Sequence, residues 1–251
     1  MSGPSGAELP SAFPRIDSHQ HFTREYLPSL LGPILKRNRF DGSVAVAGRP
    51  SVEDTRWLLS LAADHDFIRA VVGWADLADP RLGDMLDEYQ RHSKFRGVCN
   101  AFAGELPPGL GELERRELTL DVSMGFTLAI PERFPGLRVA IDGVGTARAT
   151  LPLSVAQYPN VFAKVSGLIT DAPTSWKAAV FQPAVRAALE AFGPEHVMYG
   201  SDWPSYLPEG TWKAALAAFT QAIGPQTLET REHLLGGTAH RFYRLETGDA
   251  A

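Results

Sequence analysis

The chain has 251 residues, 44% of them hydrophobic and 21% charged, and its 24 basic and 29 acidic residues give a net charge of −5. This composition is typical of a globular protein and excludes the disordered and fibrous classes. No cluster of lysine and arginine is long enough to follow a phosphate backbone, and nowhere do about 18 apolar residues run together, so we expect no nucleic-acid or membrane partner.

Cys99 is the single cysteine, so the chain can form no intramolecular disulfide and no multi-cysteine zinc site, which favours a reducing cytoplasm. Residues 1–13 are rich in glycine, proline and serine and lack the basic and apolar segments of a secretion signal. We expect them to form a flexible tail before a single domain at 14–245, with a second short tail at 246–251.

Short β-branched or apolar runs alternate along the chain with glycine, proline and amphipathic stretches, as in βα units around a parallel sheet. Apolar residues recur at helical spacing in residues 52–65, 81–92 and 181–192. The eight strand-like runs are residues 15–18, 43–47, 68–74, 95–101, 118–123, 137–141, 161–165 and 197–199. Eight strands favour an α/β fold closed into a (β/α)8 TIM barrel, because closure removes both sheet edges.

The fourth crossover of this barrel is predicted to be abbreviated. Pro107, Pro108, Gly109 and Gly111 leave only residues 112–117 for a helix between the fourth and fifth strands. We therefore expect the barrel to be distorted at this point.

Two histidines follow the first strand, in the motif Asp17-Ser18-His19-Gln20-His21. Residues two apart on an extended strand point the same way, so His19 and His21 can converge on one ligand. In barrel enzymes the carboxyl ends of the strands form the active site. The alternative is that these histidines only make hydrogen bonds in the turn after the strand.

An acidic residue ends the last strand, in Gly200-Ser201-Asp202-Trp203-Pro204. Strands one and eight are neighbours in a closed barrel, so Asp202 is expected in the same mouth as the two histidines. A carboxylate there can accept a proton from water or bind a metal. The alternative is that Asp202 caps the helix that follows.

Further motifs stand in order between and after these two clusters. They are Phe95-Arg96-Gly97-Val98, Phe134-Pro135-Gly136-Leu137-Arg138, Asn160-Val161-Phe162-Ala163-Lys164-Val165-Ser166-Gly167-Leu168 and Gly237-Thr238-Ala239-His240-Arg241-Phe242-Tyr243. With the two clusters, they make the chain resemble the amidohydrolase-2 family over about residues 16–245. Within that family the chain is most similar to the lactonase branch, which acts on sugar lactones and pyrone dicarboxylates.

The resemblance implies a barrel whose mouth hydrolyses a cyclic ester. It implies that Asp202 is the general base on water, that His19 and His21 line the floor, and that Lys164 reaches a carboxylate or carbonyl of the substrate. An alternative role for Lys164 is a salt bridge to Asp142 or Asp202 that stabilises the mouth. The residues expected to bind the substrate are Arg96, Asn100, Asp142 and Trp203.

Two positions depart from the family pattern. Asn100 stands where relatives read Phe-Arg-Gly-Val-x-His, and Gly143 stands where they read Ile-Asp-His-x-Gly. Zinc-dependent members of the wider family complete the His-x-His pair with a further histidine and the final aspartate, so the loss favours a pocket that works without a metal. The alternative is that His19, His21 and Asp202 bind zinc or another divalent metal, since three protein ligands suffice for a catalytic zinc.

The leading hypothesis is therefore a cytoplasmic hydrolase that opens a small cyclic ester, with a small molecule as its partner and a homo-oligomer as a possible assembly. A second hypothesis keeps the pocket but changes the reaction to decarboxylation or ring rearrangement. A third is a binding protein that has lost catalysis, because a fold does not fix a function.

Overall fold

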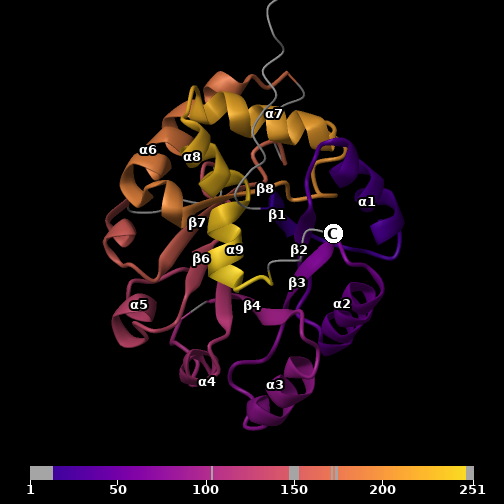
Figure 1. Ribbon diagram of the computed structural model, residues 1–251. Helices are drawn as coiled ribbons and strands as arrows, with labels where there is room; N and C mark the ends of the chain where they lie inside the picture. Colours follow the sequence, from indigo (N-terminus) through magenta and orange to yellow (C-terminus); the bar gives the residue numbers. More distant parts are fainter. Residues whose placement is uncertain (1–13, 103, 147–152, 171, 173–174, 247–251) are drawn as a thin grey trace, which may run out of the picture.

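The computed structural model describes residues 14–102, 104–146, 153–170, 172 and 175–246, so the predicted tails at 1–13 and 246–251 lie outside the described residues, Glu246 excepted. Eight parallel strands surround the centre of the molecule in the order β1 to β8 (Figure 1). They are β1 (Ile16–Gln20), β2 (Gly42–Val46), β3 (Ile68–Gly73), β4 (Phe95–Ala101), β5 (Thr119–Met124), β6 (Val139–Ile141), β7 (Val161–Ser166) and β8 (Val197–Gly200).

The barrel closes between its first and last strands. The backbone N–H of Asp202 donates to the carbonyl of His19 at 2.8 Å, and the N–H of His21 donates to the carbonyl of Trp203 at 2.7 Å. The predicted α/β barrel is confirmed, and each predicted strand is present with its ends shifted by at most two residues.

Helices cover the outside of the barrel unevenly. The helices are α1 (Pro28–Arg37), α2 (Val52–Asp64), α3 (Leu82–Gln90), α4 (Leu110–Arg115), α5 (Ala129–Arg133), α6 (Gln182–Phe192), α7 (Trp212–Ile223), α8 (Leu228–Glu232) and α9 (Thr238–Tyr243). The predicted short fourth crossover is confirmed by α4, which has 6 residues. The sequence did not indicate that α5, with 5 residues, is equally short. In the described part of the chain, no helix has the length and apolar character to cross a membrane.

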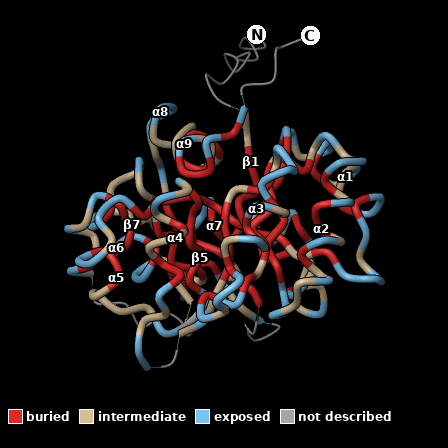
Figure 2. Tube along the Cα trace, turned by 90° about the horizontal axis from the view of Figure 1, so that it is seen from below, coloured by how far each residue is buried: buried red, intermediate tan, exposed pale blue. Residues whose placement is uncertain are grey.

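Apolar side chains form two separate cores. The outer core lies between the strands and the surrounding helices. The inner core fills the barrel and consists of Ile16, Val44, Val46, Ala70, Val72, Cys99, Ala140 and Met198, together with Ala239, Phe242, Tyr243 and Leu245 from α9 and the residues after it. Figure 2 shows α9 across one end of the barrel.

The end that α9 covers is the amino-terminal end of the strands. Arg138, which directly precedes β6, donates to the carbonyl of Phe242 in α9. The carboxyl ends of the strands therefore lie at the opposite end, where barrel enzymes place their active sites.

Candidate active site

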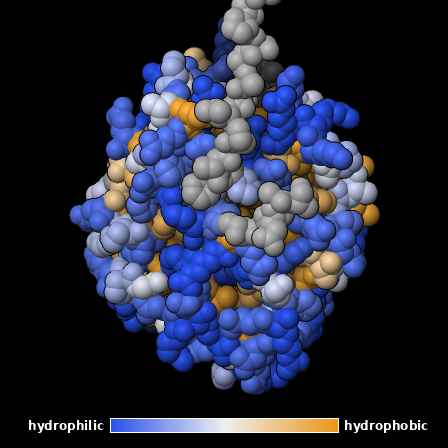
Figure 3. Space-filling view, in the orientation of Figure 1, coloured by the Kyte–Doolittle hydropathy of each residue, from blue (hydrophilic) through white to orange (hydrophobic). Residues whose placement is uncertain are grey.

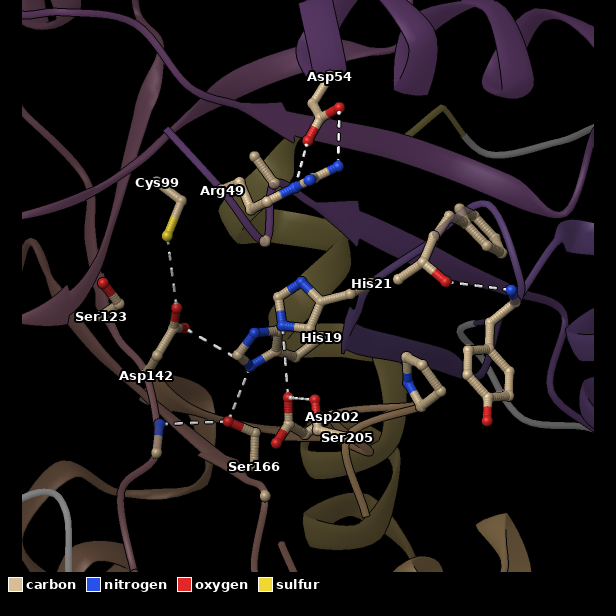
Figure 4. Close-up of a pocket in the computed structure, with 18 of the residues that line it drawn as sticks. His19, His21, Arg49, Asp54, Cys99, Ser123, Asp142, Ser166, Asp202 and Ser205 are labelled. Atoms are coloured by element: carbon tan, nitrogen blue, oxygen red, sulfur yellow. Dashed lines mark hydrogen bonds and ion pairs between the residues drawn. The ribbon is translucent and has the colours of Figure 1, made fainter. Parts of the chain in front are cut away.

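A cavity of about 1290 Å³ opens at the carboxyl ends of the strands. Side chains from β1, from the loop after β6, from β7 and from the loop after β8 meet in it (Figure 4). The polar residues that line the cavity include His19, His21, Asp142, Ser166 and Asp202.

A bulge in β1 aims the two histidines into this cavity. Ile16 belongs to the inner core, so simple alternation along the strand would turn His19 away from the barrel interior. The pairing of β1 with β2 changes register between Asp17 and Gln20, which shifts the alternation by one residue. His19 and His21 consequently point the same way, as predicted, and both line the cavity.

His21 and Asp202 face each other across the cavity floor. His21 Nε2 lies 3.3 Å from Asp202 Oδ1, and Thr170 donates its hydroxyl to Asp202 Oδ2 at 2.8 Å. Burial opposes both charges, but this contact, with the hydrogen bonds of Val46 to His21 and of Thr170 to Asp202, outweighs burial. The pKa of His21 is raised, and the pKa of Asp202 is lowered to about 2. Asp202 is therefore ionised at neutral pH.

The backbone around Asp202 is shaped for this contact. Asp202 has a φ of 64°, a left-handed conformation that aspartate tolerates better than most residues. Asp202 follows β8 in a turn whose backbone N–H donates to the carbonyl of His19, and the same turn brings the carboxylate to His21. Because its side chain contacts His21 and Thr170, the alternative that it only caps a helix is not supported.

His19 is held by β7 and by the residue that follows β6. Its Nδ1 lies 2.9 Å from the Ser166 hydroxyl and 3.9 Å from Asp142 Oδ1. The Ser166 oxygen also accepts from the backbone N–H of Gly143 at 3.2 Å. Burial and the positive charge of Lys164 hold the pKa of His19 well below its usual value, so the ring is neutral.

The donor set at the floor fits a divalent cation. His21 Nδ1 lies 2.8 Å from the carbonyl oxygen of Val46, and because a carbonyl only accepts, this nitrogen carries the ring proton. In the neutral ring, Nε2 is then an acceptor that faces a second acceptor, Asp202 Oδ1. The pair needs either another proton on His21 or a cation between the two side chains.

The same three residues bring their ligand atoms together. One nitrogen of His19, one of His21 and one carboxylate oxygen of Asp202 all lie within 4.8 Å of one another. Neutral imidazoles and a carboxylate are donors that zinc accepts, and a carbonyl or hydroxyl on the other ring nitrogen is the usual way such histidines are oriented. The donor chemistry favours the metal-binding alternative over the predicted pocket without metal.

The other predicted residues lie in different places. Asp142 lines the cavity, but Lys164 does not, because its side chain is fully buried below the floor. Lys164 Nζ lies 3.1 Å from Asp142 Oδ1, which is one of the two salt bridges that the alternative interpretation expected.

Arg96, Asn100 and Trp203 do not line the cavity, and their contact with a substrate stays a prediction. On β4 the inward position belongs to Cys99, so Asn100 points outward and donates to the Ala75 carbonyl at 3.2 Å. Arg96 lies near the start of β4, at the far end of the barrel, and donates to the Phe95 carbonyl. Trp203 is only 1% exposed and packs edge-on against Phe22 and Tyr26, behind the cavity wall.

Several site residues were not predicted. Ser166 could have been found, because it lies two residues after Lys164 on the same strand and must point to the same side. Thr170 carries no sequence signal, since its contact with Asp202 depends on the path of a loop. An ion pair at the mouth, Arg49 Nε to Asp54 Oδ2 at 2.9 Å, was also missed.

Known proteins are similar to this chain in sequence and in fold. An L-fucono-1,5-lactonase from Burkholderia multivorans is 31% identical, with 94% of this chain and 98% of that protein covered. An L-fucono-1,5-lactonase from Burkholderia ambifaria is 30% identical over 92% of this chain and 96% of its own length. A crystal structure of an amidohydrolase from Burkholderia multivorans with bound zinc superposes with a TM-score of 0.81 at 29% identity, covering 93% of this chain and all of that one.

The family comparison covers almost the whole barrel. The family model described as amidohydrolase matches residues 16–245, from the first residue of β1 to beyond α9. The matched range includes all eight strands of the barrel, and the chain belongs to the amidohydrolase family.

Proposed function

We propose that this protein hydrolyses a lactone at the carboxyl end of the barrel, with Asp202 taking the proton of the attacking water. The observation that carries the proposal is the group His19, His21 and Asp202 on the floor of the cavity, in a chain about 30% identical to two lactonases. The relatives are named for lactone hydrolysis, so decarboxylation and loss of catalysis are not favoured. The predicted homo-oligomer and cytoplasmic location stay predictions.

His19, His21 and Asp202 would hold a divalent cation, and the zinc in the related amidohydrolase supports this part of the proposal. Such a cation lowers the pKa of a bound water to about 7 and polarises an ester carbonyl. Val46 fixes the proton of His21 on Nδ1, and the Ser166 hydroxyl at Nδ1 of His19 orients that ring. Both histidines are thus held through Nδ1, and Nε2 of each ring would be the atom that binds the cation.

Asp202 moves the proton. Thr170 donates to Oδ2, whereas Oδ1 faces His21 and accepts from the Ser205 hydroxyl at 3.3 Å. As water adds to the lactone carbonyl carbon, Asp202 takes one of its protons and then gives it to the ring oxygen when the C–O bond breaks. The water becomes the hydroxyl of the new carboxyl group plus the proton on the released alcohol, so the product is an open-chain hydroxy acid.

The test is a panel of five- and six-membered sugar lactones, L-fucono-1,5-lactone included, followed with a pH indicator. We expect the wild type to open at least one of them and Asp202→Asn to lower kcat about 1000-fold, in the range general-base removal produces. Asp84→Asn, at an exposed position on α3, is the matched control and keeps kcat unchanged. A wild type inert on the whole panel, or an Asp202→Asn variant with normal kcat, contradicts the proposal.

The metal is tested separately. Elemental analysis should find about one divalent ion per chain in the wild type and a loss of it in His21→Asn, which removes one of three ligands. Dialysis against a chelator should abolish turnover, and added zinc should restore it. Full activity after complete removal of metal would contradict a catalytic role for the metal, but it would not contradict lactone hydrolysis.

A further inference from the structure

Three charged or polar side chains lie inside the barrel between α9 and the cavity. They are Asp121 on β5, Lys164 on β7 and Tyr243 on α9, and each is 0% exposed. The interior of such a barrel is ordinarily filled by branched apolar residues. A buried charged layer in this position therefore needs a physical account.

The three side chains make a continuous line of contacts toward the cavity. The Tyr243 hydroxyl donates to Asp121 Oδ2 at 2.8 Å, and Lys164 Nζ donates to the same oxygen at 2.5 Å. Lys164 Nζ also lies 3.1 Å from Asp142 Oδ1, the oxygen that is 3.9 Å from His19 Nδ1. The line begins on the C-terminal helix at one end of the barrel and reaches the wall of the cavity at the other.

Lys164 is charged and shared between two carboxylates. Burial opposes its charge, but Asp121 and Asp142 outweigh burial and hold the pKa of the ammonium well above its usual value. Lys164 precedes Ser166 by two residues on β7, so both side chains point inward, with Lys164 one layer deeper. The lysine thus reaches the substrate only through Asp142.

Stability alone does not explain this arrangement. A buried ion pair is often no more stabilising than apolar side chains of the same volume, because both charges lose their hydration. α9 is held by the side that faces the barrel, where Phe242 and Tyr243 are buried in the inner core. The coloured surface around it is largely hydrophilic (Figure 3). A phenylalanine in place of Tyr243 would pack against the inner core equally well.

We propose that Tyr243, Asp121 and Lys164 are positioning residues that hold the Asp142 carboxylate beside His19, so that the C-terminal helix contributes to turnover from the opposite end of the barrel. The Tyr243 hydroxyl neutralises part of the charge on Asp121 and leaves Lys164 available to Asp142. Without that hydroxyl, Asp121 draws the Lys164 ammonium toward itself, and the ammonium no longer holds the Asp142 carboxylate in place.

The test is Tyr243→Phe, with Tyr89→Phe as the matched control. Tyr89 is also 0% exposed, but it lies on α3 in the outer core, and its hydroxyl donates to the Trp74 carbonyl at 3.4 Å. We expect Tyr243→Phe to lower kcat about tenfold with KM unchanged, the size of effect seen when a residue behind a ligand is altered. Asp121→Asn should act in the same direction, and Tyr89→Phe should change neither constant.

A second readout does not depend on the reaction. The imidazole ¹⁵N resonances of His19 should shift in Tyr243→Phe, while those of His65 and His196, outside the cavity, stay in place. The activity measurement rests on the proposed function. The His19 resonances do not, because they respond to the position of the neighbouring Asp142 carboxylate. If no lactone is opened by the wild type, the proposed function fails and the resonances alone decide. Unchanged His19 resonances in both Tyr243→Phe and Asp121→Asn, or an equal shift in Tyr89→Phe, overturn the inference.

Discussion

Gly167 is the residue that lets β7 approach Asp202 closely. It has a φ of +68°, and a Cβ at this position would lie 2.9 Å from Asp202 Oδ2, the oxygen that Thr170 engages. Glycine is needed here for two reasons, because any other residue would be strained by the positive φ and would also push the carboxylate away. The orientation of the Asp202 carboxylate therefore depends on the absence of a side chain at position 167.

Gly167→Ala separates these two effects when it is compared with Gly193→Ala. Gly193 has a φ of +72° and nothing within 4 Å of an added Cβ, so Gly193→Ala should cause backbone strain without a steric clash. Both variants should lose about 1–3 kcal/mol of unfolding free energy in urea, because each puts a side chain on backbone that favours glycine. Only Gly167→Ala should lower kcat, by about 100-fold, the effect expected when a reacting group moves by about 1 Å. An equal loss of kcat in both variants would argue against a steric role for Gly167.

At the scale of elements, the seam between β1 and β8 assembles the site. The buried Asp17 carboxylate accepts from the backbone N–H of Ser201 at 2.8 Å and from Trp212 Nε1 of α7 at 3.0 Å. It therefore ties the first strand to the segment after β8 and to the helix that covers both. His19 and Asp202 stand on the two sides of this seam.

Asp17→Asn should weaken the seam, because an amide nitrogen would face one of two N–H donors. We expect a loss of about 1–3 kcal/mol in urea unfolding, the cost of leaving a buried polar group unpaired, together with a lower kcat. Asp41→Asn is the control, since exposed Asp41 accepts from the Arg15 N–H at 2.7 Å and water can replace that bond. A fall in stability of the same size in both variants would contradict a special role for the seam.

The strands could be predicted from sequence because each is a short apolar run between turn residues. The period of alternation was also predictable, but its phase was not, as β4 illustrates. Nothing in the sequence tells whether Cys99 or Asn100 points inward, and the bulge in β1 cannot be read from Asp17-Ser18-His19. The contact of Lys164 with Asp121 was missed because β5 and β7 are not neighbours in the sheet and meet only across the barrel interior.

At the scale of the whole molecule, the helices around the barrel differ in length. The neighbouring helices α4 and α5 have 6 and 5 residues, whereas α2 and α6, which lie on opposite sides of the barrel in Figure 1, have 13 and 11. Short helices retain few internal hydrogen bonds and depend on tertiary contacts. We therefore expect the side with α4 and α5 to open at lower free energy than the rest.

Hydrogen exchange measured by mass spectrometry checks this expectation. Amides of α4 and α5 should exchange earlier than amides of α2 and α6 in the same sample, at a temperature well below unfolding. Peptides from α2 and α6 serve as internal controls, because they pack against the same barrel. Equal protection of all four helices would show that the barrel opens only as one unit.

The hydrogen bonds that close the barrel also determine when the site forms during folding. Asp202 N–H to His19 O and His21 N–H to Trp203 O join the two proposed ligand segments and are made between the first and last strands. A ribosome-bound chain, or one refolding from denaturant, holds no complete site until its final strand has docked. Because contacts between distant segments form late, recovery of turnover should coincide with completion of the whole topology. Turnover therefore measures the completely folded barrel, and partly folded forms are expected to be inactive.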